Sequence, residues 1–185
     1  MSNTLTADLL QKAITGEFNA SKRYNAFSKI ALEEGFKNVA YLFKALVAAE
    51  KIHLKNHTQA LQKDFSPEYE DFKTGTTQDN LQSSVDGENY EFNEMYLNYI
   101  KQISKNDKSE YGEVAELSMV WARKVEYTHA EILNKALEAV KLNKDLEFNE
   151  IYVCKVCGNI ILEKPDSICP ICGHDPLFYF LVERN

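Results

Sequence analysis

Two Glu-x-x-His steps constrain the fold of this chain more than any other feature. They are Glu50-Lys-Ile-His53 and Glu126-Tyr-Thr-His129, and each lies within a long helical pattern of apolar residues. Side chains three residues apart on a helix point the same way, so each pair can reach one metal ion or two adjacent ions. The pattern therefore predicts two facing helices that bind metal.

The spacing of apolar residues predicts four helices, with the first ending near Gly35 and the others at about 38–61, 80–104 and 110–142. The segment 62–79 contains proline and glycine and has no helical periodicity. Its 18 residues could span about 59 Å when extended, enough to cross the whole length of a bundle. We therefore expect an all-α, ferritin-like four-helix bundle over residues 1–145, with a long crossover between its second and third helices.

Three further glutamates, Glu17, Glu88 and Glu91, fall on the predicted core faces. Gly16-Glu17 and Gly87-Glu88 indicate an internal repeat, and Gly16 within a helix suggests that something packs closely there. One Glu from each of two helices, with Glu-x-x-His from the other two, is typical of di-iron and di-manganese carboxylate bundles. The competing interpretation places these glutamates on the surface. His57 also lies on a core face, and we interpret it as a packing or hydrogen-bonding residue.

The number of carboxylates favours a redox site. Glu17, Glu50, Glu88 and Glu126 bring four negative charges, which neutralise two divalent ions. Glu91 is then a spare anion for a more oxidised pair of metals. A site of this composition suits redox cycling better than permanent storage of divalent ions.

All four cysteines lie near the end of the chain, in two Cys-x-x-Cys steps separated by 11 residues. This spacing predicts a tetrahedral four-thiolate metal site in a small domain over residues 150–185. Zinc and iron both fit such a site, and a structural zinc ribbon is one interpretation. We expect His174 on the surface and a small core formed by Tyr152, Ile161, Pro165, Phe178 and Phe180. The predicted ligands are Cys154, Cys157, Cys169 and Cys172.

Charge and hydropathy argue against several classes of partner. The net charge is −7 and no run of basic residues is present, which disfavours nucleic acid and anionic membranes. The sequence has neither 18 consecutive apolar residues nor a secretory signal pattern at Met1. We therefore expect a cytoplasmic protein, in which paired Cys-x-x-Cys steps are metal ligands more often than disulfides.

The order of these motifs, two Gly-Glu helices alternating with two Glu-x-x-His helices and followed by the cysteine tail, resembles the rubrerythrin family. The resemblance implies a non-haem di-iron peroxidase that reduces hydrogen peroxide to water in oxidative stress defence. It implies a rubredoxin-like Fe(Cys)4 domain of short β strands as the electron donor, reduced by an external NAD(P)H-dependent rubredoxin-type reductase. The tether 143–149 is short and leaves open whether the tail reaches its own bundle. The family implies head-to-tail homodimers or larger homo-oligomers.

The resemblance also implies roles for individual residues. Glu50 and Glu126 would bridge the two irons, Glu17 and Glu88 would be terminal ligands, and His129 would bind the second iron. His53 and Glu91 would exchange on the first iron as its oxidation state changes, and Tyr24 and Tyr96 would support the ligands. Two alternatives stay open: an iron-oxidising storage protein with a structural zinc ribbon, and a di-metal oxygenase or oxidase that uses dioxygen.

Overall fold

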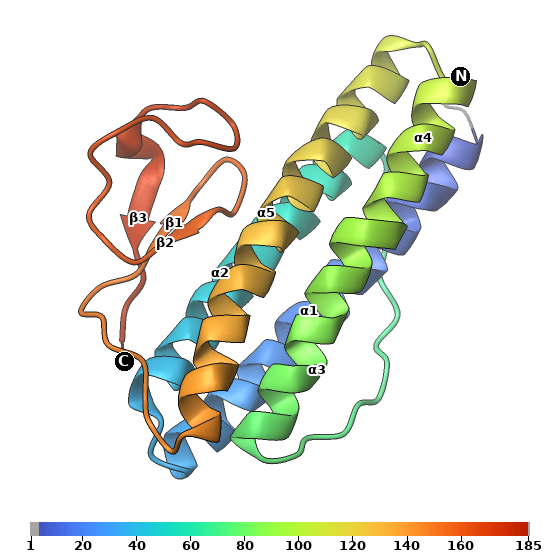
Figure 1. Ribbon diagram of the computed structural model, residues 1–185. Helices are drawn as coiled ribbons and strands as arrows, with labels where there is room; N and C mark the ends of the chain where they lie inside the picture. The colour runs from blue at the N-terminus through green and yellow to red at the C-terminus, as the bar shows by residue number, and fades with distance from the viewer. Residues whose placement is uncertain (1–3, 185) are drawn as a thin grey trace.

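The computed structural model describes residues 4–184, and its helical part is the predicted four-helix bundle (Figure 1). The first two helices form a hairpin, and α1 packs along α2. The third long helix is continuous but contains a π-helical turn, η1, between α3 and α4. The bounds are α1 Thr4–Glu33, α2 Lys37–Leu61, α3 Thr77–Tyr90, η1 Glu91–Met95, α4 Tyr96–Asn106 and α5 Glu110–Lys141.

The helix ends follow from local sequence chemistry. Gly35 adopts φ +91°, a left-handed conformation that suits glycine, and the chain turns there between α1 and α2. The helix α3 begins three residues before the predicted start. Thr76 and Asp79 form a capping box at that point, in which each side chain accepts a hydrogen bond from the other residue's backbone N–H.

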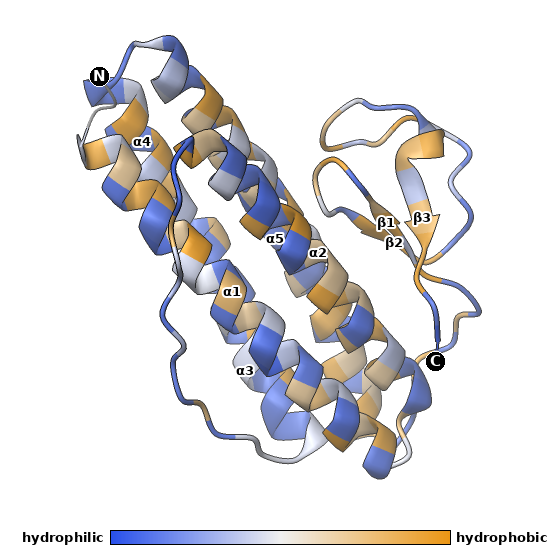
Figure 2. Cartoon of the chain, turned by 180° about the vertical axis from the view of Figure 1, so that it is seen from behind, coloured by the Kyte–Doolittle hydropathy of each residue, from blue (hydrophilic) through white to orange (hydrophobic). Residues whose placement is uncertain are grey.

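The connection between α2 and α3 crosses the full length of the bundle, as predicted. Figure 2 shows it on the outside of the helices, mostly in hydrophilic colours. The side chain of Asn19 holds its middle, because Nδ2 donates to the carbonyl oxygen of Glu68 at 3.0 Å and Oδ1 accepts from the N–H of Glu70 at 2.9 Å. Phe72 packs edge-on against Phe27 of α1.

The C-terminal segment forms a small antiparallel sheet in the order β2-β1-β3, with bounds β1 Tyr152–Cys154, β2 Ile160–Ile161 and β3 Tyr179–Leu181. A 3₁₀ turn, Pro176–Phe178, precedes β3. Alternation along the strands buries Val153, Ile160 and Tyr179. The predicted inward position of Phe178 is wrong, because this side chain lies in the 3₁₀ turn and is 44% exposed. Tyr152, Ile161, Pro165 and Phe180 are half-buried.

The sheet packs against α2 and α5 of its own chain, on one side of the bundle (Figure 1). The hydroxyl of Tyr41 in α2 donates to the carbonyl oxygen of Val182 at 2.5 Å, and Nδ2 of Asn56 donates to that of Val156 at 2.8 Å. Arg184 lies over the ring of Tyr41 and donates to backbone carbonyl groups of the tether. The short tether therefore lets the tail reach its own bundle. Among the described residues, no helix is long and apolar enough to span a membrane.

Candidate metal centres

Six of the seven predicted bundle ligands meet in the core, in two groups that share Glu50 and Glu126. Each residue offers one possible ligand atom, a nitrogen or an oxygen, and within each group these atoms all lie within 4.8 Å of one another. All six residues are buried. The helices α1, α2, α3 and α5 each contribute. The groups are Glu17, Glu50, His53 and Glu126, and Glu50, Glu88, Glu126 and His129.

The two shared carboxylates each face both histidines. Oε1 of Glu126 lies 3.0 Å from Nδ1 of His53, and its Oε2 lies 3.0 Å from Nδ1 of His129. Glu50 is arranged in the same way, with Oε2 at 3.1 Å from His53 and Oε1 at 3.6 Å from His129. One carboxylate whose two oxygens point into two adjacent groups has the geometry of a bridging ligand.

Glu17 and Glu88 each belong to only one of the two groups, and a tyrosine hydroxyl from another helix donates to each of them. Oε1 of Glu17 lies 3.7 Å from Nδ1 of His53, and Oε2 of Glu88 lies 3.5 Å from Nδ1 of His129. The hydroxyl of Tyr96 donates to Glu17, whereas that of Tyr24 donates to Glu88. The spacing of residues could not reveal this crossed arrangement, because each pair joins distant parts of the chain.

The polar atoms of these residues fit a pair of bound cations. Both carboxylate oxygens of Glu126 and both ring nitrogens of His129 are buried without a hydrogen-bond partner, as is one oxygen each of Glu17 and Glu88. Buried groups of this kind cost several kcal/mol if they stay uncompensated. Two divalent ions would neutralise the four glutamates and use these atoms as ligands.

Proton affinities in the cluster reflect the crowding of like charges. Burial and then the charge of Glu126 raise the pKa of Glu50 well above its ordinary value, and burial also raises the pKa of Glu126. Burial alone would lower the pKa of His53, but the carboxylates of Glu126, Glu17 and Glu50 together outweigh it and raise that pKa well above 6.5. For Glu17, burial is outweighed by the hydrogen bond and charge of His53, and its pKa falls to about 2.

Glu91 is the predicted ligand that lies outside both groups. It is the first residue of the π-helical turn and is half-buried. The spacing of apolar residues predicts an uninterrupted α-helix over 80–104 and does not indicate this turn. A π turn inserts one extra residue into a helix and is frequent at functional sites, but no residue pattern in the chain marks its position.

His57 is hydrogen-bonded, as predicted, and belongs to neither group of ligand atoms. Its Nε2 lies 3.0 Å from the hydroxyl of Tyr96 and its Nδ1 lies 3.0 Å from that of Ser118. Burial lowers its pKa to about 4, so the ring is neutral at pH 7. His57 therefore supports the tyrosine that donates to Glu17.

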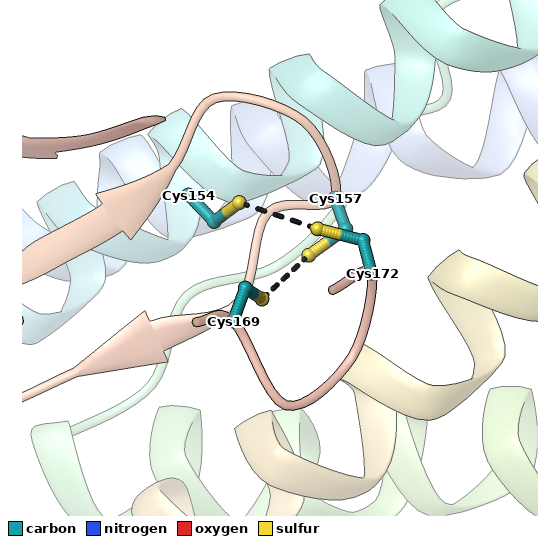
Figure 3. A group of neighbouring side chains, drawn as sticks. All are labelled: Cys154, Cys157, Cys169 and Cys172. Carbon is teal, nitrogen blue, oxygen red and sulfur yellow. Dashed lines mark hydrogen bonds between the residues drawn. The ribbon is translucent and has the colours of Figure 1, made fainter. Parts of the chain in front are cut away.

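The four cysteines of the tail converge as predicted (Figure 3). The Sγ atoms of Cys154 and Cys172 are 3.7 Å apart, and those of Cys157 and Cys169 are 3.6 Å apart. These separations exceed a disulfide bond of about 2.05 Å. They approach the edge of about 3.8 Å that a tetrahedron with metal–sulfur bonds of about 2.3 Å would have. Gly158 and Gly173, each with positive φ, follow the second cysteine of each step.

The two centres are linked by one imidazole ring. Nδ1 of His53 lies among the carboxylates, and Nε2 lies 3.0 Å from the carbonyl oxygen of Cys157. The adjacent Gly158 makes this approach possible, since a Cβ there would lie 2.8 Å from Nε2 of His53. The prediction that Gly16 allows close packing is wrong, because a Cβ at Gly16 would meet no atom within 4 Å.

Comparisons with known proteins agree with this arrangement. The family profile named Rubrerythrin matches residues 8–118. Rubrerythrin-2 of Clostridium acetobutylicum is 34% identical over 177 residues, covering 94% of each chain. Nigerythrin of Nitratidesulfovibrio vulgaris is 33% identical over 90% of this chain and 81% of its own length.

Solved structures extend the likeness to the whole chain. A structure of nigerythrin in a mixed-valent state matches with a TM-score of 0.86 and 26% identity, covering 98% of this chain and 88% of nigerythrin. The bacterioferritin BfrA of Mycobacterium tuberculosis, at 19% identity and a TM-score of 0.65 over 78% of this chain, shares the fold alone. The carboxylate–histidine cluster and the four-cysteine site fit the iron cofactors of rubrerythrins. The chain belongs to the rubrerythrin family.

Proposed function

We propose that this protein is a di-iron peroxidase that reduces hydrogen peroxide to water with electrons that enter through the four-cysteine centre. The observation that carries the proposal is the position of His53, whose ring contacts both centres. A storage protein with a structural zinc ribbon has no need for such a contact. An enzyme that moves electrons between the two centres benefits from it, because a short covalent and hydrogen-bonded path favours electron transfer.

In this proposal each predicted ligand has a distinct role. Glu50 and Glu126 would be shared by the two irons, which is supported by the way their oxygens face His53 and His129. Glu17 and His53 would complete the first iron site. Glu88 and His129 would complete the second, and a third iron would be held by Cys154, Cys157, Cys169 and Cys172.

The reduction of one hydrogen peroxide to two waters takes two electrons and two protons. Iron, when bound, supplies the electrons, one from each metal. A relative is known in forms described as mixed-valent and as fully reduced and all ferrous, which supports redox cycling here. Burial raises the pKa of Tyr24 and of Tyr96 well above 10, so both stay protonated. They orient Glu88 and Glu17 by donating to them.

Glu91 has the role of an exchangeable carboxylate opposite His53. In this structure His53 lies inside the cluster and Glu91 lies outside it. Burial and then the charge of Glu17 raise the pKa of Glu91 well above 4.5. The same burial and repulsion oppose entry of the ionised Glu91 carboxylate into the cluster. Metals that carry more positive charge would offset this cost and favour its entry.

The proposal also implies a cellular compartment, an electron donor and an oligomeric state. Thiolate ligands held without disulfides suit a reducing compartment such as the cytoplasm. An NAD(P)H-dependent rubredoxin-type reductase would refill the four-cysteine iron one electron at a time. The head-to-tail homodimer that the family implies would present the same contacts between two chains instead of within one.

The proposal is tested by mixing anaerobically reduced protein with one equivalent of hydrogen peroxide in a stopped-flow spectrometer. We expect oxidation of the di-iron centre at least about tenfold faster than with an equal concentration of dioxygen. Oxidation no faster than with dioxygen would contradict peroxidase function. A second measurement is the metal content of protein purified without added metal. Iron in the cysteine site supports the electron path, and stoichiometric zinc there would favour the storage alternative.

A further inference from the structure

A cationic side chain of α5 contacts the π-helical turn at two points. Nε of Arg123 donates a hydrogen bond to the backbone carbonyl oxygen of Phe92 at 2.9 Å. The guanidinium carbon of Arg123 also lies 4.5 Å from the centre of the Phe92 ring, which is a cation–π distance. Arg123 therefore contacts both the backbone and the ring of the residue that follows Glu91.

The Phe92 ring has a second partner on α5. The rings of Phe92 and Tyr127 have centroids 5.2 Å apart and an interplanar angle of 50°, a separation at which aromatic pairs attract. Tyr127 comes four residues after Arg123 in the same helix, so both side chains lie on one face of α5. Through Phe92, the two side chains place the π turn against α5.

The hydrogen bond from Arg123 fits the π form of this turn. In an α-helix the N–H of Tyr96 would donate to the carbonyl oxygen of Phe92, four residues earlier. In this structure it donates to the carbonyl oxygen of Glu91, five residues earlier. The carbonyl of Phe92 loses the donor that it would have in an α-helix, and Arg123 supplies another. A donor at this position favours the π form over the α form.

The backbone of the π turn determines where Glu91 lies relative to the metal ligands. Glu88, three residues earlier, belongs to one ligand group, and Tyr96, five residues later, donates to Glu17. Because Arg123 also holds the carbonyl of Phe92, the backbone is fixed on both sides of Glu91. The Glu91 carboxylate can then approach the cluster by rotation of its side chain, without a shift of the helix.

We propose that Arg123 is a positioning residue for Glu91. Its hydrogen bond to Phe92 keeps the π turn in place, so that the Glu91 carboxylate starts from a fixed point beside the cluster. This inference rests on the proposed function in one respect, which is the role of Glu91 as an exchangeable ligand. The hydrogen bond between Arg123 and the π turn does not depend on that role.

The first test measures amide hydrogen exchange in the iron-loaded full-length protein by mass spectrometry. Arg123→Met keeps a long, unbranched side chain with high helix propensity but removes the donor and the charge. Lys124→Met is the matched control, because it removes the same charge at the next, exposed position of α5. In Arg123→Met we expect peptides that contain residues 92–97 to exchange at least about tenfold faster, and those from α1 and α2 to stay within about twofold.

Two results of this test would overturn the proposal. One is an exchange rate of residues 92–97 in Arg123→Met that equals the rate in the parent protein or in Lys124→Met. The other is faster exchange of equal size throughout the bundle, because it would show a general loss of stability.

The second test asks whether Arg123 acts through Glu91, with azide as a probe of the oxidised, iron-loaded protein. Azide is a small anion that would compete with a carboxylate for a position on ferric iron, and its binding is followed by visible absorption. We expect Glu91→Ala to bind azide about tenfold more tightly than the parent and Arg123→Met about fivefold more tightly. In the Glu91→Ala background, adding Arg123→Met should change the affinity by less than about twofold.

The outcomes separate this inference from the proposed function. If Glu91→Ala tightens azide binding but Arg123→Met does not, the inference fails and the role of Glu91 stands. An equal effect of Arg123→Met with and without Glu91 would also overturn the inference, because Arg123 would then act by another route. If Glu91→Ala leaves the azide affinity unchanged, the exchangeable role of Glu91 fails, and the positioning role of Arg123 fails with it.

Discussion

Gly158 faces His53 so closely that a Cβ at this position would lie 2.8 Å from the imidazole Nε2. The substitution Gly158→Ala should therefore push the cysteine turn away from α2 as well as strain its backbone, which has φ +86°. We expect electron transfer from the cysteine centre to the di-iron centre to slow by about tenfold or more in single-turnover stopped-flow measurements.

Gly173→Ala is the matched control for this prediction. Gly173 occupies the equivalent place in the second cysteine turn and has φ +74°, but a Cβ there would meet nothing within 4 Å. Both variants should lose about 1 kcal/mol of stability from backbone strain. Equal electron-transfer rates in the two variants would show that the approach to His53 is unimportant.

The substitution His53→Gln should interrupt the same path without removing a carboxylate. We expect iron to bind more weakly at one of the two positions and internal electron transfer to slow by about tenfold, measured by metal titration and stopped-flow absorption. Asn56→Ala is the control, because it removes a hydrogen bond to the carbonyl of Val156 and contacts neither metal group. The prediction is contradicted if the Asn56 variant slows as much as the His53 variant.

The substitution Glu91→Ala should slow turnover with peroxide by about tenfold while the bundle stays folded, since Glu91 is half-buried and outside both ligand groups. Glu94→Ala tests the same π turn at an exposed position and should leave turnover unchanged. Steady-state kinetics and circular dichroism would check both outcomes. Unchanged kinetics in the Glu91 variant would remove it from the proposed mechanism.

Metal removal should reverse the dependence of stability on pH. In the apoprotein, the raised pKa values of Glu50, Glu126 and His53 mean that the folded state binds more protons than the unfolded state. Stability is then fully present below the unfolded pKa of each group and is lost as pH rises through its folded pKa. Glu17, with a pKa near 2, has the opposite sign and loses stability only as pH falls from about 4.5 toward 2.

We therefore expect the free energy of unfolding of the apoprotein to fall between pH 5.5 and 7.5, by up to about 1.4 kcal/mol per pH unit for each extra proton bound. In the iron-loaded protein the metals displace these protons, so stability should rise over the same range. Urea titrations of both forms at the two pH values would measure the difference. Parallel trends in the two forms would contradict the prediction.

The sequence predicted the bundle and most of its cluster because their determinants are local. Glu50 and His53 are three residues apart, and helical geometry alone places them on one face. The same holds for Glu126 and His129 and for the two cysteine turns. The crossed pairs, Tyr96 with Glu17 and Tyr24 with Glu88, depend on how separate helices pack, which local spacing does not encode.

The contacts between the tail and the bundle likewise could not be predicted from local sequence patterns, because they join residues that are far apart in the chain. Tyr179 lies at the start of β3, and alternation along the strand explains its burial, but its hydrogen bond depends on where Asn159 lies in space. Phe178 was expected in the core because of its apolar side chain. Its exposure follows from the 3₁₀ turn at Pro176–Phe178, which the apolar pattern did not indicate.

The π-helical turn Glu91–Met95 changes which face of the third long helix the residues after it occupy. In a regular α-helix each residue turns by about 100°, so the eight steps from Glu88 to Tyr96 would leave the two side chains about 80° apart. A π turn uses more residues per turn and removes most of that excess. Glu88 and Tyr96 are both buried and both reach the cluster. Deleting a single residue from this turn should restore a regular α-helix with seven steps, about 700°, between Glu88 and Tyr96, so that both side chains still face the cluster.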